Sequence, residues 1–127
     1  MSAFRDNLFE GKTAFIAGGT SGINLGIAKR FAELGAKVSV AGRNAEKASA
    51  AAAEIGHSAI GLSTDVRDYA ATRTALEAAS EAFGPLDFVI SGAAGNFVAP
   101  ALGMSANGFK TVVDIDLIGT FNVFRAC

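Results

Sequence analysis

A glycine-rich turn at residues 17–26 is the first segment whose residue types and spacing could do chemistry. It reads AGGTSGINLG and separates a short apolar run from a stretch with helical spacing of apolar residues. A turn between a strand and a helix leaves backbone N–H groups unpaired at the positive end of the helix dipole, where a phosphate group binds. Many such turns are glycine-rich for steric reasons alone. The turn therefore indicates a nucleotide site only if strand–helix–strand units surround it.

Two positions narrow the type of nucleotide. Ile23 follows Gly22 at the place where a P-loop requires a lysine and then a serine or threonine, which argues against a triphosphate site. The second apolar run ends in Val40-Ala41-Gly42-Arg43, which offers no carboxylate to the ribose 2′-OH of NAD. The guanidinium of Arg43 suits the 2′-phosphate of NADP(H) instead. The alternative is a solvated surface arginine.

Asp116 is a second candidate, because it lies among apolar residues at helical spacing. We expect these apolar residues to form one stripe that faces the core: Phe109, Val113, Leu117, Phe121 and Phe124. A carboxylate inside such a stripe is costly to bury unless it is paired, so it should accept hydrogen bonds from backbone groups or a cation, or have a raised pKa. A structural pairing and a carboxylate of an active site both remain open.

The elements that would position these residues alternate along the chain. Short apolar runs predict strands, and Ala-rich stretches with helical spacing predict helices. Asn44 and Ser105 are candidate N-caps, and Gly35 is a candidate C-cap glycine. We expect strands at 13–17, 37–41, 58–63 and 87–91, and helices at 23–34, 44–55, 68–83 and from 106 to the end of the sequence.

This alternation predicts an α/β fold with a Rossmann-type, doubly wound parallel sheet. Four βα units are present, whereas the full dinucleotide-binding order has six strands. We therefore expect residues 1–127 to be the N-terminal dinucleotide-binding part of a single Rossmann domain, with the C-terminal catalytic portion absent. The chain alone is expected to be inactive.

Composition excludes several classes of protein. Half of the residues are hydrophobic, 18% are charged, and the net charge is -1, which argues against disorder and against a nucleic-acid-binding surface. The single cysteine, Cys127, and the single histidine, His57, have no partners at metal-ligand spacing. No apolar run is long enough for a membrane span. We expect a cytoplasmic protein with no metal, no membrane partner and no nucleic-acid partner.

Several segments together resemble the short-chain dehydrogenase/reductase family. They are Gly18-Gly19-Thr20-Ser21-Gly22-Ile23, Thr64-Asp65-Val66, Ala93-Ala94-Gly95 and Asp116-Leu117-Ile118-Gly119-Thr120-Phe121. The runs at 92–97 and 109–116 are most similar to the 2,4-dienoyl-CoA reductases, particularly the peroxisomal type and its bacterial relatives. The resemblance covers the whole chain and implies an NADP(H)-dependent oxidoreductase.

The resemblance also implies a cofactor role for particular residues. Gly18, Thr20, Ser21, Gly22 and Ile23 would lie along the pyrophosphate, Arg43 would hold the 2′-phosphate, Asp65 and Val66 would frame the adenine, and Ser91 and Ala93 would pass beneath the adenosine-side ribose. Two positions depart from the family pattern. Asn24 replaces the usual last glycine of the turn, and Ser91-Gly92 replaces a common Asn-Asn pair.

For catalysis, the resemblance singles out Asp116. Most members of the family carry Asn at this position, whereas the peroxisomal-type dienoyl-CoA reductases carry Asp, which is thought to pair with a downstream Lys and position a water. That Lys and any Tyr-x-x-x-Lys motif lie outside this sequence. Asn96 and Phe97 follow the fourth strand, where ligands enter open α/β sheets, and are candidate substrate contacts.

We therefore expect a reductase of an unsaturated acyl-CoA, a 2,4-dienoyl-CoA, in its full-length form. The alternatives are another short-chain reductase that acts on an acyl thioester or a ketone, and a non-catalytic NADP(H)-binding or oligomerisation module. A second apolar face on the last helix, formed by Val112, Ile115 and Ile118, predicts a homo-oligomer that associates through this helix.

Overall fold

The computed structural model describes residues 3–127 as a four-stranded parallel sheet with helices on both faces. The strands are β1 (Thr13–Ala17), β2 (Lys37–Gly42), β3 (Ile60–Ser63) and β4 (Phe88–Ser91). The helical elements are α1 (Gly22–Glu33), α2 (Ala45–Ile55), α3 (Tyr69–Phe83), the 3-10 turn η1 (Ala101–Gly103), α4 (Ala106–Val113), the π-helical turn η2 (Asp114–Ile118) and α5 (Gly119–Ala126).

The strand order is β3-β2-β1-β4, which matches four of the six strands of the doubly wound dinucleotide-binding order and confirms the predicted fold class. From β1 to β3 each new strand is added on one side of the sheet, and β4 is then added on the other side, next to β1. In register, Ala17 lies beside Ala41 of β2 and beside Ser91 of β4. This reversal creates a crevice outside the carboxyl ends of the strands, where open α/β sheets bind ligands.

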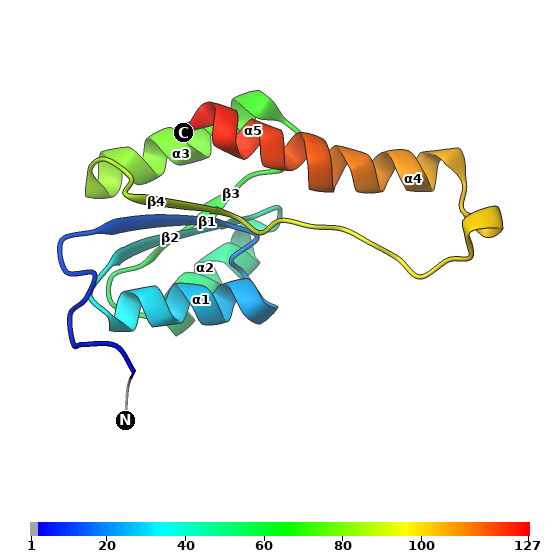
Figure 1. Cartoon of the computed structure of the whole chain (residues 1–127). Helices are drawn as coiled ribbons and strands as arrows, with labels where there is room; N and C mark the ends of the chain where they lie inside the picture. Colours follow the sequence, from blue (N-terminus) through cyan, green and yellow to red (C-terminus); the bar gives the residue numbers. More distant parts are fainter. Residues whose placement is uncertain (1–2) are drawn as a thin grey trace.

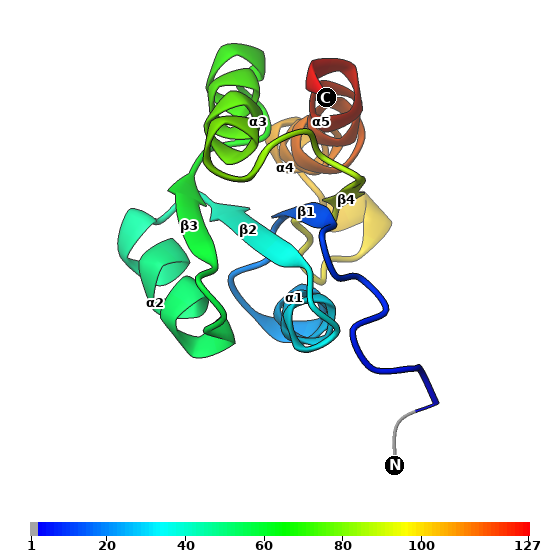
Figure 2. The ribbon, with the colours of Figure 1, turned by 90° about the vertical axis from the view of Figure 1, so that its left-hand side faces the viewer.

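Helices α1 and α2 cover one face of the sheet, and α3 and α5 cover the other (Figures 1 and 2). Because side chains alternate along a strand, β1 contributes to two cores. Ile16 packs with Val38, Val40 and Ala28 on the α1 side, whereas Phe15 packs with Leu76 and Val123 on the α3 side. All five residues of β1 are buried, because helices cover β1 on both faces of the sheet.

The predicted helix starts are mostly confirmed by their caps. The side chain of Asn44 accepts from the backbone N–H of Lys47, and that of Ser105 accepts from the N–H of Gly108. Asp68 lies one residue before α3, where its carboxylate accepts from the N–H of Ala71. Asp68 is therefore a cap and not the first helical residue, as sequence spacing had suggested.

The predicted core-facing stripe of the last helix is wrong. Phe109, Leu117, Phe121 and Phe124 are 62%, 66%, 61% and 54% exposed. The face that packs on the sheet carries smaller residues at spacings of four and three: Ile115, Gly119, Asn122, Val123 and Ala126. Both faces are apolar, and only a face with small side chains lets α5 approach β4 and α3 closely. The larger apolar groups therefore point outward.

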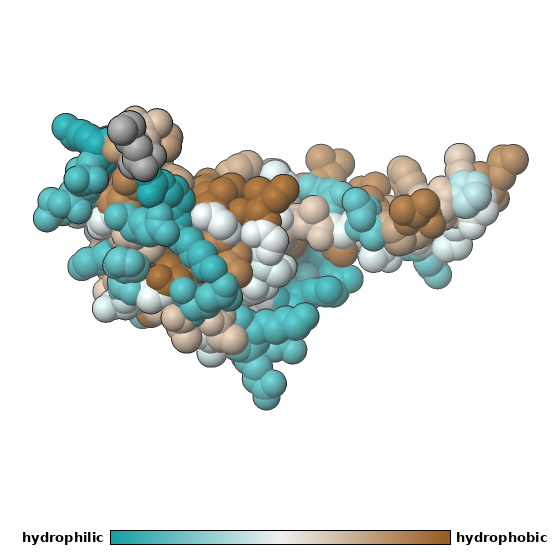
Figure 3. Space-filling view, turned by 90° about the horizontal axis from the view of Figure 1, so that it is seen from below, coloured by the Kyte–Doolittle hydropathy of each residue, from teal (hydrophilic) through white to brown (hydrophobic). Residues whose placement is uncertain are grey.

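Helix α4 and the loop before it extend away from the sheet (Figure 1). We call residues 96–113 the arm. Seen from below in Figure 3, the arm extends beyond the body of the molecule, and apolar side chains, drawn in brown, recur along it. Within residues 3–127, no helix combines the length and the apolar character that crossing a membrane requires.

Candidate cofactor site

A cavity of about 350 Å³ occupies the crevice at the carboxyl ends of the four strands. The turns after β1, β2, β3 and β4 all contribute to its walls. Among the predicted cofactor residues, it brings together Gly18, Thr20, Ser21, Arg43, Asp65, Val66 and Ala93. Gly22, Ile23 and Ser91 adjoin these residues in the chain but do not line the cavity.

The N-terminus of α1 opens toward this crevice without a side-chain cap. Ser21 occupies the N-cap position but makes no capping hydrogen bond, and the first backbone bond runs from the N–H of Leu25 to the carbonyl of Ser21. By contrast, α2, α3 and α4 are each capped by a side chain. The first N–H groups of α1 are therefore available to an anion, and the helix dipole favours one there.

Gly18 shapes the wall of the crevice beside this helix. Its φ is +73°, which side-chain-bearing residues rarely adopt, and a Cβ at this position would lie 2.7 Å from backbone atoms of Gly92 and Ala93. Its N–H donates to the carbonyl of Ala41 at 2.8 Å. The turn after β1 thus lies directly against the loop after β4, and only glycine permits that approach.

Arg43 lies at the end of β2 on the rim of the crevice. Its side chain is exposed, and the structure gives its guanidinium no ion pair with any of residues 3–127. The backbone at this position is held by the hydroxyl of Ser63, which donates to the carbonyl of Arg43 at 3.2 Å. The backbone of Arg43 is thus held at the rim, and its guanidinium is available to bind a phosphate group.

Asp65 forms an ion pair that sequence spacing did not reveal. Arg67 donates to it from Nε at 3.0 and 3.1 Å, from Nη2 at 2.6 Å and from its backbone N–H at 3.0 Å. The Arg67 side chain is the main cause of the lowered pKa of Asp65, and the charge of Arg43 contributes. An adenine amino group at Asp65 would share the carboxylate with this guanidinium.

The neighbours of Asp65 connect the crevice to α5. Asn122, which is 6% exposed, donates from Nδ2 to the carbonyl of Val66 at 2.8 Å. Sequence reasoning missed Asn122, although a polar residue on a core-facing position is a recognisable signal. Thr64 is also 6% exposed, and its Oγ1 has no hydrogen-bond partner within residues 3–127. Because Thr64 lines the crevice, this hydroxyl is a candidate ligand contact.

Asp116 is exposed, so the predicted burial of this carboxylate is wrong. Of the partners that the sequence left open, a backbone group and a cation, the structure shows a backbone group, because Oδ1 of Asp116 accepts from the N–H of Gly95 at 2.8 Å. Its carbonyl accepts from the hydroxyl of Thr120 at 2.6 Å, and Asp116 lies within the π-helical turn η2. Such turns often occur at functional sites because they redirect side chains within a helix.

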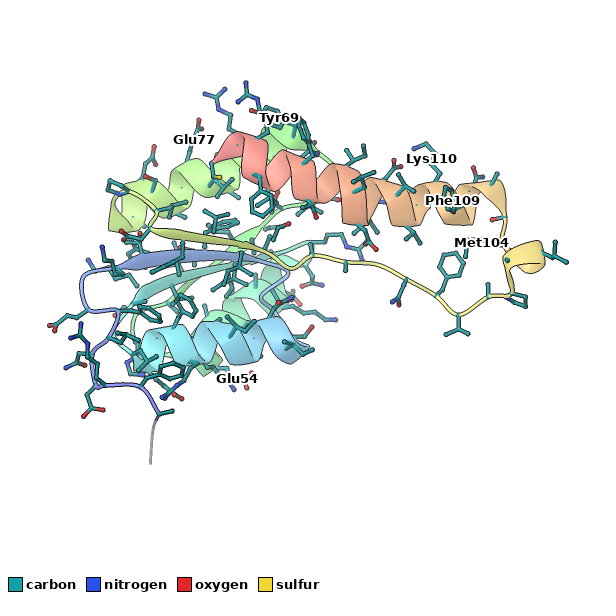
Figure 4. The ribbon with its side chains drawn as sticks, in the orientation of Figure 1. Glu54, Tyr69, Glu77, Met104, Phe109 and Lys110 are labelled. Carbon is teal, nitrogen blue, oxygen red and sulfur yellow. The ribbon has the colours of Figure 1, made fainter. Side chains whose placement is uncertain are left out.

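The candidate substrate residues lie on the arm, outside the crevice. Asn96 is exposed, and Phe97, at 47% exposure, lies against α4 so closely that a Cβ on Gly108 would meet its ring at 2.7 Å. Met104, Phe109 and Lys110 also lie on the arm (Figure 4). Neither Asn96 nor Phe97 lines the crevice, although Asn96 directly follows Gly95, which does.

The crevice residues fit a dinucleotide cofactor. An uncapped helix N-terminus and a close glycine turn lie on the walls of one site. Thr64, whose buried hydroxyl has no partner within residues 3–127, lies on the same walls. The rim arginine adds a positive charge at the end of β2, where the adenosine ribose of a dinucleotide lies in this fold.

Comparison with known proteins gives one consistent family. Residues 12–127 match the family model described as short chain dehydrogenase. Over 98% of its length, the chain is 42% identical to a peroxisomal 2,4-dienoyl-CoA reductase from Arabidopsis thaliana, covering 43% of that protein. Over 88% of its length, it is 43% identical to a probable 2,4-dienoyl-CoA reductase from Bacillus subtilis, covering 45% of it. The chain thus spans less than half the length of these relatives.

Solved structures agree with this result. The chain is similar to a citronellol catabolism dehydrogenase from Pseudomonas aeruginosa with a TM-score of 0.89 and 36% identity, covering 98% of this chain and 52% of that one. It is also similar to a 3-ketoacyl-(acyl-carrier-protein) reductase from Brucella melitensis complexed with NADH, with a TM-score of 0.86 and 34% identity over 92% of this chain and 48% of that one. The chain therefore belongs to the short-chain dehydrogenase family of oxidoreductases, which use NAD(P)(H).

Proposed function

We propose that this chain is the cofactor-binding part of an NADP(H)-dependent reductase of 2,4-dienoyl-CoA thioesters. The observation that carries the proposal is the crevice, where the uncapped N-terminus of α1 and the exposed Arg43 lie on the walls of one site. The identity of 42% to a dienoyl-CoA reductase supports the substrate class.

The preference for NADP(H) over NAD(H) rests on the end of β2. Arg43 lines the crevice there, and no carboxylate of β2 is present to accept from a ribose 2′-OH. A charge-assisted hydrogen bond to a 2′-phosphate contributes about 1.5–3 kcal/mol, which corresponds to a preference of roughly one to two orders of magnitude.

The remaining cofactor contacts follow from the walls of the crevice. The N–H groups at Gly22 and Ile23 would hold the pyrophosphate, with Gly18, Thr20 and Ser21 beside it. Asp65 and Val66 would hold the adenine, and Ser91 and Ala93 the adenosine-side ribose. When bound, NADPH supplies the hydride that reduces the conjugated thioester.

Asp116 is the residue of this chain that we assign to catalysis. Its Oδ1 accepts from the N–H of Gly95, which lines the crevice, and its backbone carbonyl accepts from the hydroxyl of Thr120. Within residues 3–127 its Oδ2 has no partner, so it can accept a hydrogen bond from a water or an ammonium group. In that position it would orient a proton donor toward the thioester, whose negative charge develops during reduction.

The proposal also includes the domain organisation and the oligomeric state. Residues 1–127 form the N-terminal part of a single Rossmann domain. Among residues 3–127, β4 pairs only with β1, so its other edge is open to further strands. The predicted second apolar face does not point outward as a whole, because Ile115 packs on the core whereas Ile118 is exposed. The exposed apolar groups Leu117 of η2 and Phe121 of α5 support a homo-oligomer formed through the last helix instead. The named relatives include peroxisomal proteins and a bacterial one, so the cytoplasmic location stays a prediction.

The direct test uses the protein purified from its source at its natural length. Its intact mass would be measured first, and NADPH oxidation would then be followed with a 2,4-dienoyl-CoA, a 3-ketoacyl thioester and a simple ketone. We expect turnover with the dienoyl-CoA, and a loss of about 10²–10⁴-fold in kcat for Asp116→Ala with NADPH binding retained.

Two outcomes would support the alternatives. Turnover of the ketoacyl thioester or the ketone, without the dienoyl-CoA, would indicate another short-chain reductase. An intact mass near 12.9 kDa with NADP(H) binding and no turnover would indicate a non-catalytic module.

A further inference from the structure

A side-chain hydrogen bond joins the first turn of α1 to the end of β4. Asn24 donates from Nδ2 to the carbonyl of Gly92 at 2.8 Å, across 68 positions of the chain. Both residues line the crevice, and the contact is partly buried. A neutral hydrogen bond in such a place holds two segments together only if its geometry is maintained by packing.

The carboxamide of Asn24 packs directly on the backbone of Gly92, which is possible because Gly92 has no side chain. A Cβ at this position would lie 2.3 Å from Nδ2 of Asn24 and 2.5 Å from both Cγ and Oδ1. All three atoms of the carboxamide therefore lie against the Gly92 Cα. Because the φ of Gly92 is outside the left-handed region, glycine is required here for space and not for backbone conformation.

The loop that this contact holds also holds Asp116. The N–H of Gly92 donates to the carbonyl of Ala17 at 3.0 Å, and three residues later the N–H of Gly95 donates to the Asp116 carboxylate at 2.8 Å. Residues 92–95 are thus attached to β1 and α1 at one end and to η2 at the other. A shift of Gly92 would move the donor that orients Asp116.

The same contact links position 24 with position 92, where the chain departs from the family pattern. The resemblance leads one to expect glycine at 24 and asparagine at 92, whereas this chain has asparagine at 24 and glycine at 92. The carboxamide comes here from the helix and not from the strand end. Asn24 in this position requires glycine at 92, because a side chain at 92 would displace its carboxamide.

We propose that Asn24 is a positioning residue whose carboxamide, packed on Gly92, fixes the loop 92–95 and through Gly95 the carboxylate of Asp116. The functional part of this inference rests on the proposed function, since it assigns Asp116 to catalysis. The structural coupling of Asn24 with Gly92 does not depend on that assignment.

A double-mutant cycle on the protein at its natural length tests the coupling. The variants are Asn24→Ala, Gly92→Ala and both together, and Gly26→Ala is the control because a Cβ at Gly26 meets nothing within 4 Å. Hydrogen exchange of the Gly95 N–H reports on the loop, and that of the Val40 N–H in β2 reports on global stability. NADP⁺ affinity is measured in parallel.

We expect each single variant to speed Gly95 exchange by about 10-fold relative to Val40 and to weaken NADP⁺ binding by about 3–10-fold. The double variant should be no worse than Asn24→Ala alone, because removal of the carboxamide leaves room for a Cβ at 92. Gly26→Ala should change neither quantity.

Additive effects of the two substitutions would overturn the proposal, and so would equal changes at Gly95 and Val40, which indicate a general loss of stability. Gly95 exchange needs no cofactor. If NADP⁺ failed to bind the unmodified protein, the proposed function would fail, whereas the exchange data would still decide the coupling.

Discussion

The crevice and the arm are held in place by different kinds of contact. In the crevice, backbone bonds connect neighbouring strand ends, from Gly18 to Ala41 at 2.8 Å and from Thr64 to Gly42 at 2.9 Å. In the arm, the bonds are local, such as that from the Thr111 hydroxyl to the carbonyl of Asn107 at 2.8 Å. The shape of the crevice is therefore fixed by hydrogen bonds between segments that are distant in the chain. The arm, by contrast, is held mainly by hydrogen bonds between residues that are close in the chain.

Their surfaces differ in the same way. The walls of the crevice carry small residues and polar side chains, among them Thr64, whose hydroxyl has no hydrogen-bond partner within residues 3–127. The arm and the helix that continues it carry large apolar side chains, and Val98 and Leu102 are fully exposed. Exposed apolar surface of this kind is characteristic of a binding face, whereas a crevice at the carboxyl ends of the strands is characteristic of a nucleotide site.

Gly18→Ala should break the crevice most strongly. It adds a Cβ at a positive φ and within 2.7 Å of the backbone at Gly92 and Ala93, so we expect a loss of about 2–4 kcal/mol in the free energy of unfolding. Gly11→Ala is the matched control, because its φ of +75° is nearly the same and its Cβ meets nothing within 4 Å. Urea unfolding should give a loss of only about 1 kcal/mol there. Equal losses would contradict the close approach of the two loops.

Asn122→Ala tests the contact between α5 and Val66 on the wall of the crevice. The carbonyl of Val66 would lose its buried partner, so we expect a loss of about 1–3 kcal/mol in the free energy of unfolding. Arg125→Ala, at an exposed position of the same helix, should change the free energy by less than about 0.5 kcal/mol. Unchanged stability of Asn122→Ala would show that the Val66 carbonyl finds water instead.

The strands, caps and long-range contacts differ in how far the sequence alone could predict them. The strands, the N-caps Asn44 and Ser105 and the residues of the glycine turn follow local rules and could be predicted. The contacts from Asn122 to Val66 and from Asn24 to Gly92 join positions 56 and 68 apart, and no local pattern encodes them. The stripe on the last helix was assigned to the wrong face because both faces are apolar, and periodicity alone does not say which one the sheet covers.

Phe121→Glu tests the outward face of α5 as a site of self-association. This side chain is 61% exposed, so a charge there should leave the melting temperature nearly unchanged and shift the mass measured by light scattering toward the monomer. Ser49→Glu, at an exposed position of α2 on the opposite side of the sheet, is the control. A monomeric unmodified protein at its natural length would contradict the association.

The smallest expected effect is an acid-dependent loss of stability at the far end of the sheet. The backbone N–H of Thr13 and the side chain of Lys12 hold the pKa of Asp87 below its ordinary value. Its folded pKa lies below its unfolded pKa, so its contribution is present above about pH 4 and is lost as pH falls through the folded value. Asp87→Asn should therefore lower the urea midpoint at pH 6 and reduce its change between pH 6 and pH 3. An unchanged midpoint at pH 6 would contradict this role.

The central claim is that the crevice holds NADP(H) through Arg43, and paired titrations of NADP⁺ and NAD⁺ test it most directly. The unmodified protein should bind NADP⁺ more tightly, and Arg43→Ala should weaken NADP⁺ binding by about 10–100-fold while NAD⁺ binding changes by less than about 2-fold. Equal weakening of both cofactors would contradict the claim, because Arg43 would then not distinguish the 2′-phosphate.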